Sequence, residues 1–199
     1  MTVVQTLQSW LYQQTWAEIT GVITGLLCVY LAAKNIIWNW PFAIVNVSIY
    51  IFIFFEARLF ADMGLQVYLL IMNIYGWYYW SRQAETTGKP PVIRIAKNTI
   101  IITIAGIVTA TAFLGSVLRY TPASYPYLDS FCAACSLAAQ VLLARKVLEN
   151  WLIWIFVDVI YVVIYFFKDL HLTAAMYGIY VVLALIGYLN WKKEWQRQL

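Results

Sequence analysis

The sequence predicts an all-α integral membrane protein with seven transmembrane helices. Of its 199 residues, 63% are hydrophobic and 11% are charged, which leaves too little polar surface to cover a water-soluble protein of this length. Seven apolar stretches approach the roughly 20 residues that a helix needs to cross a bilayer. They run at about 17–33, 38–55, 62–80, 98–118, 127–144, 150–167 and 172–190.

The chain also repeats itself once, at a constant offset of 111 residues. The matching positions are Asn39 and Asn150, Trp40 and Trp151, Tyr50 and Tyr161, Phe55 and Phe166, Leu59 and Leu170, Gly76 and Gly187, and Trp80 and Trp191. Secondary transporters are commonly built from such repeats, with the substrate site between them. We therefore expect a single transporter domain over residues 1–199, with a 3+1+3 arrangement of parallel repeats. Repeat one covers about 17–81, a linker and the fourth helix about 82–118, and repeat two about 127–193.

Each helix of the first repeat has its own local signal. The first contains Gly21 and Gly25 at the small-xxx-small spacing that permits close helix contact. The second begins just before Pro41, which is tolerated in a first helical turn because its missing N–H is not needed there. The third ends in the aromatic run 77–80, which is typical of a membrane interface.

The remaining segments follow in the same way. The hydrophilic stretch 81–97 contains glycine and proline and predicts a linker, and the fourth span, 98–118, lacks polar clusters and is expected to be scaffold. In the fifth helix, Cys132 and Cys135 are expected to be small packing residues rather than a metal or redox site. The seventh helix ends near Trp191, which we assign to the second aromatic belt.

The distribution of basic residues predicts the orientation in the membrane, because cytoplasmic loops accumulate Lys and Arg. With the N-terminus outside, the inner loops hold Lys34, Arg82, Lys89, Arg94, Lys97, Arg145, Lys146, Lys192, Lys193 and Arg197. The outer loops then hold only Arg58, Arg119 and Lys168. We therefore expect a multi-pass protein of the bacterial inner membrane with its N-terminus outside and its C-terminus in the cytoplasm.

The sixth span carries the most informative polar residue. Its residues Trp151, Trp154, Asp158, Tyr161 and Tyr165 share one helix face, and Asp158 lies near the middle of the span. A carboxylate at that depth costs about 2.5 to 3.5 kcal/mol unless it is compensated. It is either hydrogen-bonded to neighbouring Asn, Gln or Tyr side chains, or it lines a cavity. In a cavity with aromatic rings, it would bind a flat organic cation through charge attraction and cation–π contact.

Other polar side chains lie at membrane depth on the second, third and fifth spans. They are Asn46, Gln66, Asn73 and Gln140. Such amides are often hydrogen-bonded between helices, but in a cavity they can also bind a sugar or a heterocycle. We therefore include them as candidate substrate-binding residues, together with Asn39 and Trp40 at the start of the second span.

Several function classes are disfavoured by the sequence. An enzyme needs a nucleophile, metal ligands or paired acids at one depth, and the spans supply one isolated acid. The chain has no glycine-rich loop ending in lysine for binding a nucleotide. We expect no catalytic residue, cofactor, metal site or nucleic-acid partner. A membrane scaffold that transports nothing is the alternative from another class.

Motifs in both halves resemble the PnuC family of bacterial vitamin transporters. The resemblance covers about residues 18–193 and rests on four segments. They are Asn39-Trp40-Pro41-Phe42 with Asn46, Leu59-Phe60-Ala61-Asp62-Met63 with Gln66, Asn73-Ile74-Tyr75-Gly76-Trp77-Tyr78, and Glu149-Asn150-Trp151-Leu152-Ile153-Trp154 with Asp158. The motif positions that correspond to the family's site are Asn39, Trp40, Asn46, Trp151, Trp154 and Asp158.

This resemblance implies both an architecture and an activity. The architecture is the 3+1+3 arrangement, similar to that of SWEET-type sugar transporters, assembled as a homotrimer in the lipid bilayer. The activity is import of a cationic B-type vitamin, nicotinamide riboside, by facilitated diffusion with alternating access, after which phosphorylation in the cytoplasm traps the vitamin for NAD biosynthesis. Sub-branches of the family imply thiamine or riboflavin as the alternative substrate.

Overall fold

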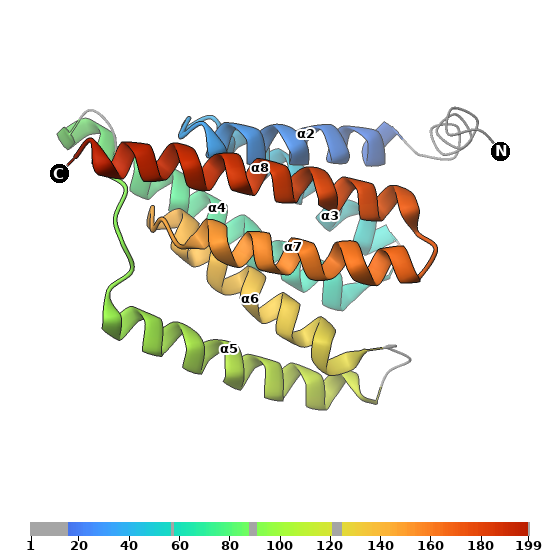
Figure 1. The fold of residues 1–199 in the computed structure, drawn as a ribbon. Helices are drawn as coiled ribbons and strands as arrows, with labels where there is room; N and C mark the ends of the chain where they lie inside the picture. The colour runs from blue at the N-terminus through green and yellow to red at the C-terminus, as the bar shows by residue number, and fades with distance from the viewer. Residues whose placement is uncertain (1–15, 57, 88–90, 121–124, 199) are drawn as a thin grey trace.

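The computed structural model describes residues 16–56, 58–87, 91–120 and 125–198, and these residues form seven helices (Figure 1). The helices are α2 (Trp16–Ala33), α3 (Asn39–Glu56), α4 (Phe60–Thr87), α5 (Lys97–Leu118), α6 (Pro126–Ala144), α7 (Asn150–Phe167) and α8 (His171–Gln196). The predicted all-α fold is confirmed, and the described residues form the predicted number of helices.

Five of these helices are both long and apolar enough to cross a membrane, namely α3, α5, α6, α7 and α8. The apolar part of α2 that could be assessed, Thr20–Ala33, is shorter than a full span. Helix α4 has 28 residues, but Asp62, Gln66 and Asn73 lower its mean hydropathy. One of these polar residues, Asn73, is a candidate site residue and lines a cavity between the helices.

The helices pack as two sets of three (Figure 1). In the first set α3 packs against α2 and α4, and in the second α7 packs against α6 and α8. Two further contacts join the sets, between α2 and α8 and between α4 and α6. Among the described helices, α5 packs only against α6, at the edge of the molecule. The interior between the two sets is therefore bounded by six helices and excludes α5.

Helix ends in the two sets occur at positions 111 residues apart. Helix α3 spans 39–56 and α7 spans 150–167, while α2 ends at 33 and α6 at 144. Four loop residues have a left-handed backbone, with φ of 60° at Asn35, 59° at Lys146, 57° at Arg58 and 57° at Asp169.

Each left-handed residue follows a helix in a Schellman cap. At the end of α2, the Asn35 N–H donates to the carbonyl of Ala32 at 2.9 Å, and the Ile36 N–H donates to Leu31 at 2.9 Å. After α6, the Lys146 N–H donates to Leu143 at 3.0 Å. The N–H of the next residue, Val147, donates to the carbonyl of Leu142 at 2.9 Å. Equivalent loops in the two sets therefore have the same backbone geometry.

Four tryptophans form a core at the end of the bundle where α3 and α7 begin. Their ring centroids are 5.2 Å apart for Trp40 and Trp80, 5.7 Å for Trp80 and Trp191, and 5.4 Å for Trp151 and Trp191. The Trp80 indole N–H donates to the carbonyl of Ala144 at 3.1 Å, and that of Trp191 donates to Ala32 at 3.0 Å. Each of these bonds joins one set of helices to the other.

This core corrects one sequence prediction. Trp80 and Trp191 were assigned to interfacial aromatic belts, but they are only 1% and 0% exposed. Their rings pack against other indoles and their N–H groups have carbonyl partners, so they face the bundle interior rather than lipid headgroups. Trp77 and Tyr78, from the same predicted belt, are exposed as expected. Lys146 is also buried, with its ammonium 4.5 Å from the Trp80 ring centroid, in a cation–π contact.

Candidate substrate-binding site

A cavity of about 290 Å³ lies between the two sets of helices. Its wall contains eight of the eleven site residues that the sequence predicted. They are Asn39, Trp40, Asn46, Asn73, Gln140, Trp151, Trp154 and Asp158. The six helices α2, α3, α4, α6, α7 and α8 all contribute to it, so residues far apart in the sequence meet at one place.

The wall is built largely from equivalent positions of the two sets. Seven pairs of lining residues are 111 positions apart: Val29 and Gln140, Ala32 and Leu143, Trp40 and Trp151, Ala43 and Trp154, Val47 and Asp158, Leu69 and Tyr180, and Asn73 and Ala184. Only the tryptophan pair is identical. In several pairs one member is polar and the other aliphatic, so equivalent positions of the two sets present different side chains to the cavity.

Two tryptophans on this wall are held in place by glycines. A Cβ on Gly187 of α8 would lie 2.6 Å from Cε2 of Trp151, and a Cβ on Gly76 of α4 would overlap the ring of Trp40. Real Cβ atoms do not approach ring atoms so closely, so both positions need glycine for steric reasons. The indoles therefore pack directly on the backbone of the neighbouring helix, which fixes their orientation at the cavity.

The same tryptophans have buried donors without partners. Among the described residues, nothing accepts a hydrogen bond from Nε1 of Trp40 or of Trp151, and nothing donates one to Oδ1 of Asn39. Buried polar atoms are almost always hydrogen-bonded in proteins, so unpaired ones need an explanation. Because all three residues line the cavity, their unpaired atoms are suited to bind a ligand or ordered water.

Asp158 is the acidic group of this cavity and is 6% exposed. Within the described ranges, no lysine or arginine forms an ion pair with it, and no side chain hydrogen-bonds to it. The structure therefore gives no support to the alternative in which neighbouring Asn, Gln or Tyr side chains satisfy the carboxylate. A buried carboxylate without a cation makes the cavity favourable for a positively charged ligand.

Three other amides of the wall, Gln140, Asn73 and Asn46, already have protein partners. Gln140 of α6 donates from Nε2 to Oδ1 of Asn73 on α4, at 2.7 Å. Asn46 of α3 donates from Nδ2 to the carbonyl of Gly21 on α2 at 2.5 Å and to Oγ1 of Thr24 at 3.3 Å. These bonds join neighbouring helices, so the amides stabilise the bundle with one part of their hydrogen-bonding capacity.

Removing one member of the Gln140–Asn73 pair should destabilise the protein. We expect Gln140→Leu to cost about 1 kcal/mol, because Asn73, which is 3% exposed, loses the donor to its carbonyl oxygen. The double variant with Asn73→Leu should cost less than the sum of the two single changes, since it leaves no unpaired amide. Thermal unfolding of the four proteins in one detergent measures this coupling. Strictly additive losses would show that the two amides do not depend on each other.

Three predicted site residues do not line the cavity, namely Gln66, Tyr161 and Tyr165. The spacing of residues along a helix predicts the face on which each lies, but not its depth relative to a cavity. Gln66 lies seven residues before Asn73, which is about 10.5 Å along the helix axis. Tyr161 and Tyr165 lie beyond Asp158, towards the same end of the bundle. Both pack against Tyr177, with ring centroids 4.9 and 5.3 Å away.

Helix α8 contributes two tyrosines that the sequence analysis missed, Tyr177 and Tyr180. The repeat could have identified them. Position 177 is equivalent to Gln66 and position 180 to Leu69, which lines the cavity from α4. The position 111 residues after each candidate of the first repeat lies in the second repeat, whether or not the two residues are identical. For the candidates on α4, these positions lie on α8, which forms part of the cavity wall.

Comparisons with known proteins agree with this arrangement. Residues 15–193 match the family described as nicotinamide mononucleotide transporter. The nicotinamide riboside transporter PnuC of Escherichia coli is 32% identical over 90% of this chain and 86% of its own length. The riboflavin/roseoflavin transporter RibM of Streptomyces davaonensis is 27% identical over 88% of this chain and 84% of its own length.

A solved structure has the same fold. The crystal structure of the vitamin B3 transporter PnuC matches with a TM-score of 0.75 and 24% identity, over 98% of this chain and 88% of that one. These relatives are transporters rather than enzymes, which confirms the expectation drawn from the isolated acid. The protein is thus a multi-pass transporter of the bacterial inner membrane. With the family match extending over nearly its whole length, the chain belongs to the nicotinamide mononucleotide transporter family.

Proposed function

We propose that this transporter imports a cationic vitamin, nicotinamide riboside, by facilitated diffusion. The observation that carries the proposal is the buried carboxylate of Asp158, which has no ion-pair partner among the residues that the structure describes. It lies in a cavity that also contains Trp40, Trp151 and Trp154. Nicotinamide riboside combines a flat, permanently charged pyridinium ring with a ribose. The indole faces suit the ring, and the unpaired Asn39 oxygen and indole N–H groups suit the ribose hydroxyls.

The electrostatics separate the candidate vitamins. A unit positive charge about 4 Å from the carboxylate gains about 4 kcal/mol at an effective dielectric constant of about 20. Riboflavin, which is neutral, gains nothing from this interaction and would leave the buried charge uncompensated. Thiamine also carries a fixed positive ring, so it remains the second candidate. The Escherichia coli relative named for nicotinamide riboside supports the first.

The proposed mechanism is rocking of two repeats around the cavity, driven by the substrate gradient. Repeat one covers about 17–81 and repeat two about 127–193, with 82–118 as the linker and a scaffold helix. The proposal is supported by the equivalent helix ends and Schellman caps of the two sets. It is also supported by the seven lining pairs, since both repeats would share the site equally.

Two further parts of the proposal concern orientation and assembly. The N-terminus lies outside and the C-terminus in the cytoplasm, which is supported by the ten basic residues in the inner loops against three in the outer ones. The tryptophan core then lies at the cytoplasmic end. The protein forms a homotrimer. This part of the proposal is supported by the resemblance to the PnuC family, which implies that assembly.

Titration of the purified protein with nicotinamide riboside, thiamine and riboflavin tests the proposal. Calorimetry gives the affinity, and quenching of the ten tryptophans reports occupancy, because three of them line the cavity. Tight binding of nicotinamide riboside, with weaker binding of the other two, is the expected result. Preference for thiamine would move the assignment to the other cation, and binding of no vitamin would favour the scaffold alternative.

A further inference from the structure

A second hollow, of about 550 Å³, lies outside the candidate transport site. It is lined by α5 and α6, with Tyr68 of α4 and the segment before α5 at its margins. On α5 the lining extends from Thr99 to Ala110, about 16.5 Å at 1.5 Å per residue. That length exceeds half of a hydrocarbon core of about 30 Å. The hollow is therefore long enough to hold an extended acyl chain along much of one leaflet.

The floor of this hollow is apolar and open. Its side chains include Ile102, Ile107, Leu137 and Val141. At Gly106 of α5, an added Cβ would have no neighbouring atom within 4 Å, so the space beside the helix is open there. Since α6 is the only described helix that packs against α5, this open space is left for lipid or another molecule to fill.

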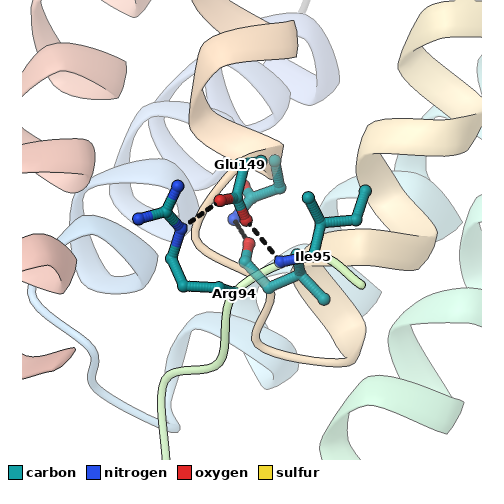
Figure 2. Close-up of polar contacts among 5 residues, drawn as sticks. Arg94, Ile95 and Glu149 are labelled. Atoms are coloured by element: carbon teal, nitrogen blue, oxygen red, sulfur yellow. Dashed lines mark hydrogen bonds and ion pairs between the residues drawn. The ribbon is translucent and has the colours of Figure 1, made fainter. Parts of the chain in front are cut away.

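One end of the hollow is built by polar contacts. Glu149, at the start of α7, accepts hydrogen bonds from Nε of Arg94 and, at 2.9 Å, from the backbone N–H of Ile95 (Figure 2). The Ile93 N–H also donates to the carbonyl of Lys146 at 3.1 Å, and the Leu148 N–H to that of Ile93 at 2.9 Å. These bonds hold the segment before α5 against the α6–α7 loop, so this rim is an ordered structure.

The rim carries uncompensated positive charge. Arg94 forms an ion pair with Glu149. The hydrogen bond to Glu149 is the larger cause, and the negative charge of Glu149 the smaller, of a raised pKa of the Arg94 guanidinium. The guanidinium of Arg145, which also lines the hollow, forms no ion pair or hydrogen bond within the described part of the chain. Lys97 is exposed one residue after the lining residue Ala96. With the Arg94–Glu149 pair neutral overall, Arg145 and Lys97 leave the rim cationic.

We propose that this hollow binds one anionic phospholipid, with an acyl chain along α5 and α6 and its phosphate at Arg145. Basic pockets between transmembrane helices are suited to anionic headgroups, whereas a zwitterionic lipid would gain less from the same rim. The bound lipid fills the hollow that α5 and α6 line together, and its site is separate from the vitamin cavity.

The test uses the full-length protein purified in a neutral detergent, titrated with phosphatidylglycerol or phosphatidylcholine. Native mass spectrometry counts the retained lipids, and thermal unfolding follows the stabilisation. We expect one tightly retained phosphatidylglycerol and weaker retention of phosphatidylcholine. Arg145→Gln should weaken phosphatidylglycerol binding about fivefold, the effect of about one basic residue at a membrane surface. Lys34→Gln, the same charge change at the end of α2, should leave it unchanged.

A second pair of variants tests the acyl-chain part independently. Gly106→Leu fills the hollow and should lower the retention of both lipids. Gly64→Leu, on α4, also places its Cβ in open space but outside the hollow, and should retain lipid like the unmodified protein. Equal retention of the two lipids, or equal losses in Arg145→Gln and Lys34→Gln, would overturn the proposal. A third outcome would also overturn it: Gly106→Leu loses the oligomer, and the unmodified protein does not distinguish phosphatidylglycerol from phosphatidylcholine. That result would assign the hollow to a contact between copies of the chain.

Discussion

Replacing Asp158 with asparagine is expected to weaken binding of nicotinamide riboside at least tenfold. The substitution keeps the shape of the side chain but removes the negative charge of the cavity, and a tenfold loss corresponds to about 1.4 kcal/mol. Folding should be unaffected or slightly favoured, because an unpaired carboxylate at membrane depth is itself costly. Calorimetric titration of both proteins gives the two Kd values, and thermal unfolding verifies that the variant is folded.

Asp129→Asn provides the matched control for this charge change. Asp129 lies in the first turn of α6, is partly buried and does not line the cavity, so its replacement should leave the affinity unchanged. Unaltered affinity in Asp158→Asn, with the protein folded, would show that the carboxylate has a structural role. Equal losses in both variants would indicate a general effect of protein charge rather than a contact in the cavity.

The second large effect is expected at the glycines beneath the two cavity tryptophans. Gly187→Ala and Gly76→Ala each place a methyl group inside the ring of Trp151 or Trp40, so the indole or the helix must move. Overpacking of this kind typically costs about 1 to 3 kcal/mol. Vitamin binding should fall as well, because both rings form part of the cavity wall. Thermal unfolding and tryptophan quenching measure the two effects in the same samples.

Each of these variants has a control on its own helix. A Cβ at Gly64 of α4 or Gly178 of α8 meets no atom within 4 Å. Alanine at these positions should be neutral or stabilise the helix by up to about 1 kcal/mol, because glycine is the poorer helix former. If Gly187→Ala were as stable as Gly178→Ala and bound the vitamin normally, the tight packing of Trp151 on α8 would not matter for the site.

Much of the fold could be predicted because a bilayer restricts the possible structures. Apolar stretches near the length of a span must be helical, so seven of them predicted seven helices. The depth of individual aromatic residues could not be read in the same way. Trp80 and Trp191 lie at helix ends, where a belt is the usual interpretation, and only the packing shows that they face the interior. Whether a helix end faces lipid or another helix depends on its neighbours.

The candidate site was predictable where residues were unusual for their depth. Asp158 and the amides Asn46, Asn73 and Gln140 are polar groups in apolar spans, and all four line the cavity. Periodicity defines a face but not how far a cavity extends along it, so Tyr161 was included although the cavity ends before it. Tyr177 and Tyr180 line the cavity but were not predicted, since tyrosine is common in membrane spans and only the repeat distinguishes these two.

Uptake of labelled nicotinamide riboside into liposomes that contain the purified protein tests the central claim most directly. The liposomes should have no ion gradient, and empty liposomes and liposomes with Asp158→Asn serve as comparisons. We expect saturable uptake that stops when the inside and outside concentrations are equal, with a much lower apparent affinity in the variant. Uptake no faster than in empty liposomes, or accumulation that requires an imposed proton gradient, would contradict facilitated diffusion of this vitamin by the protein.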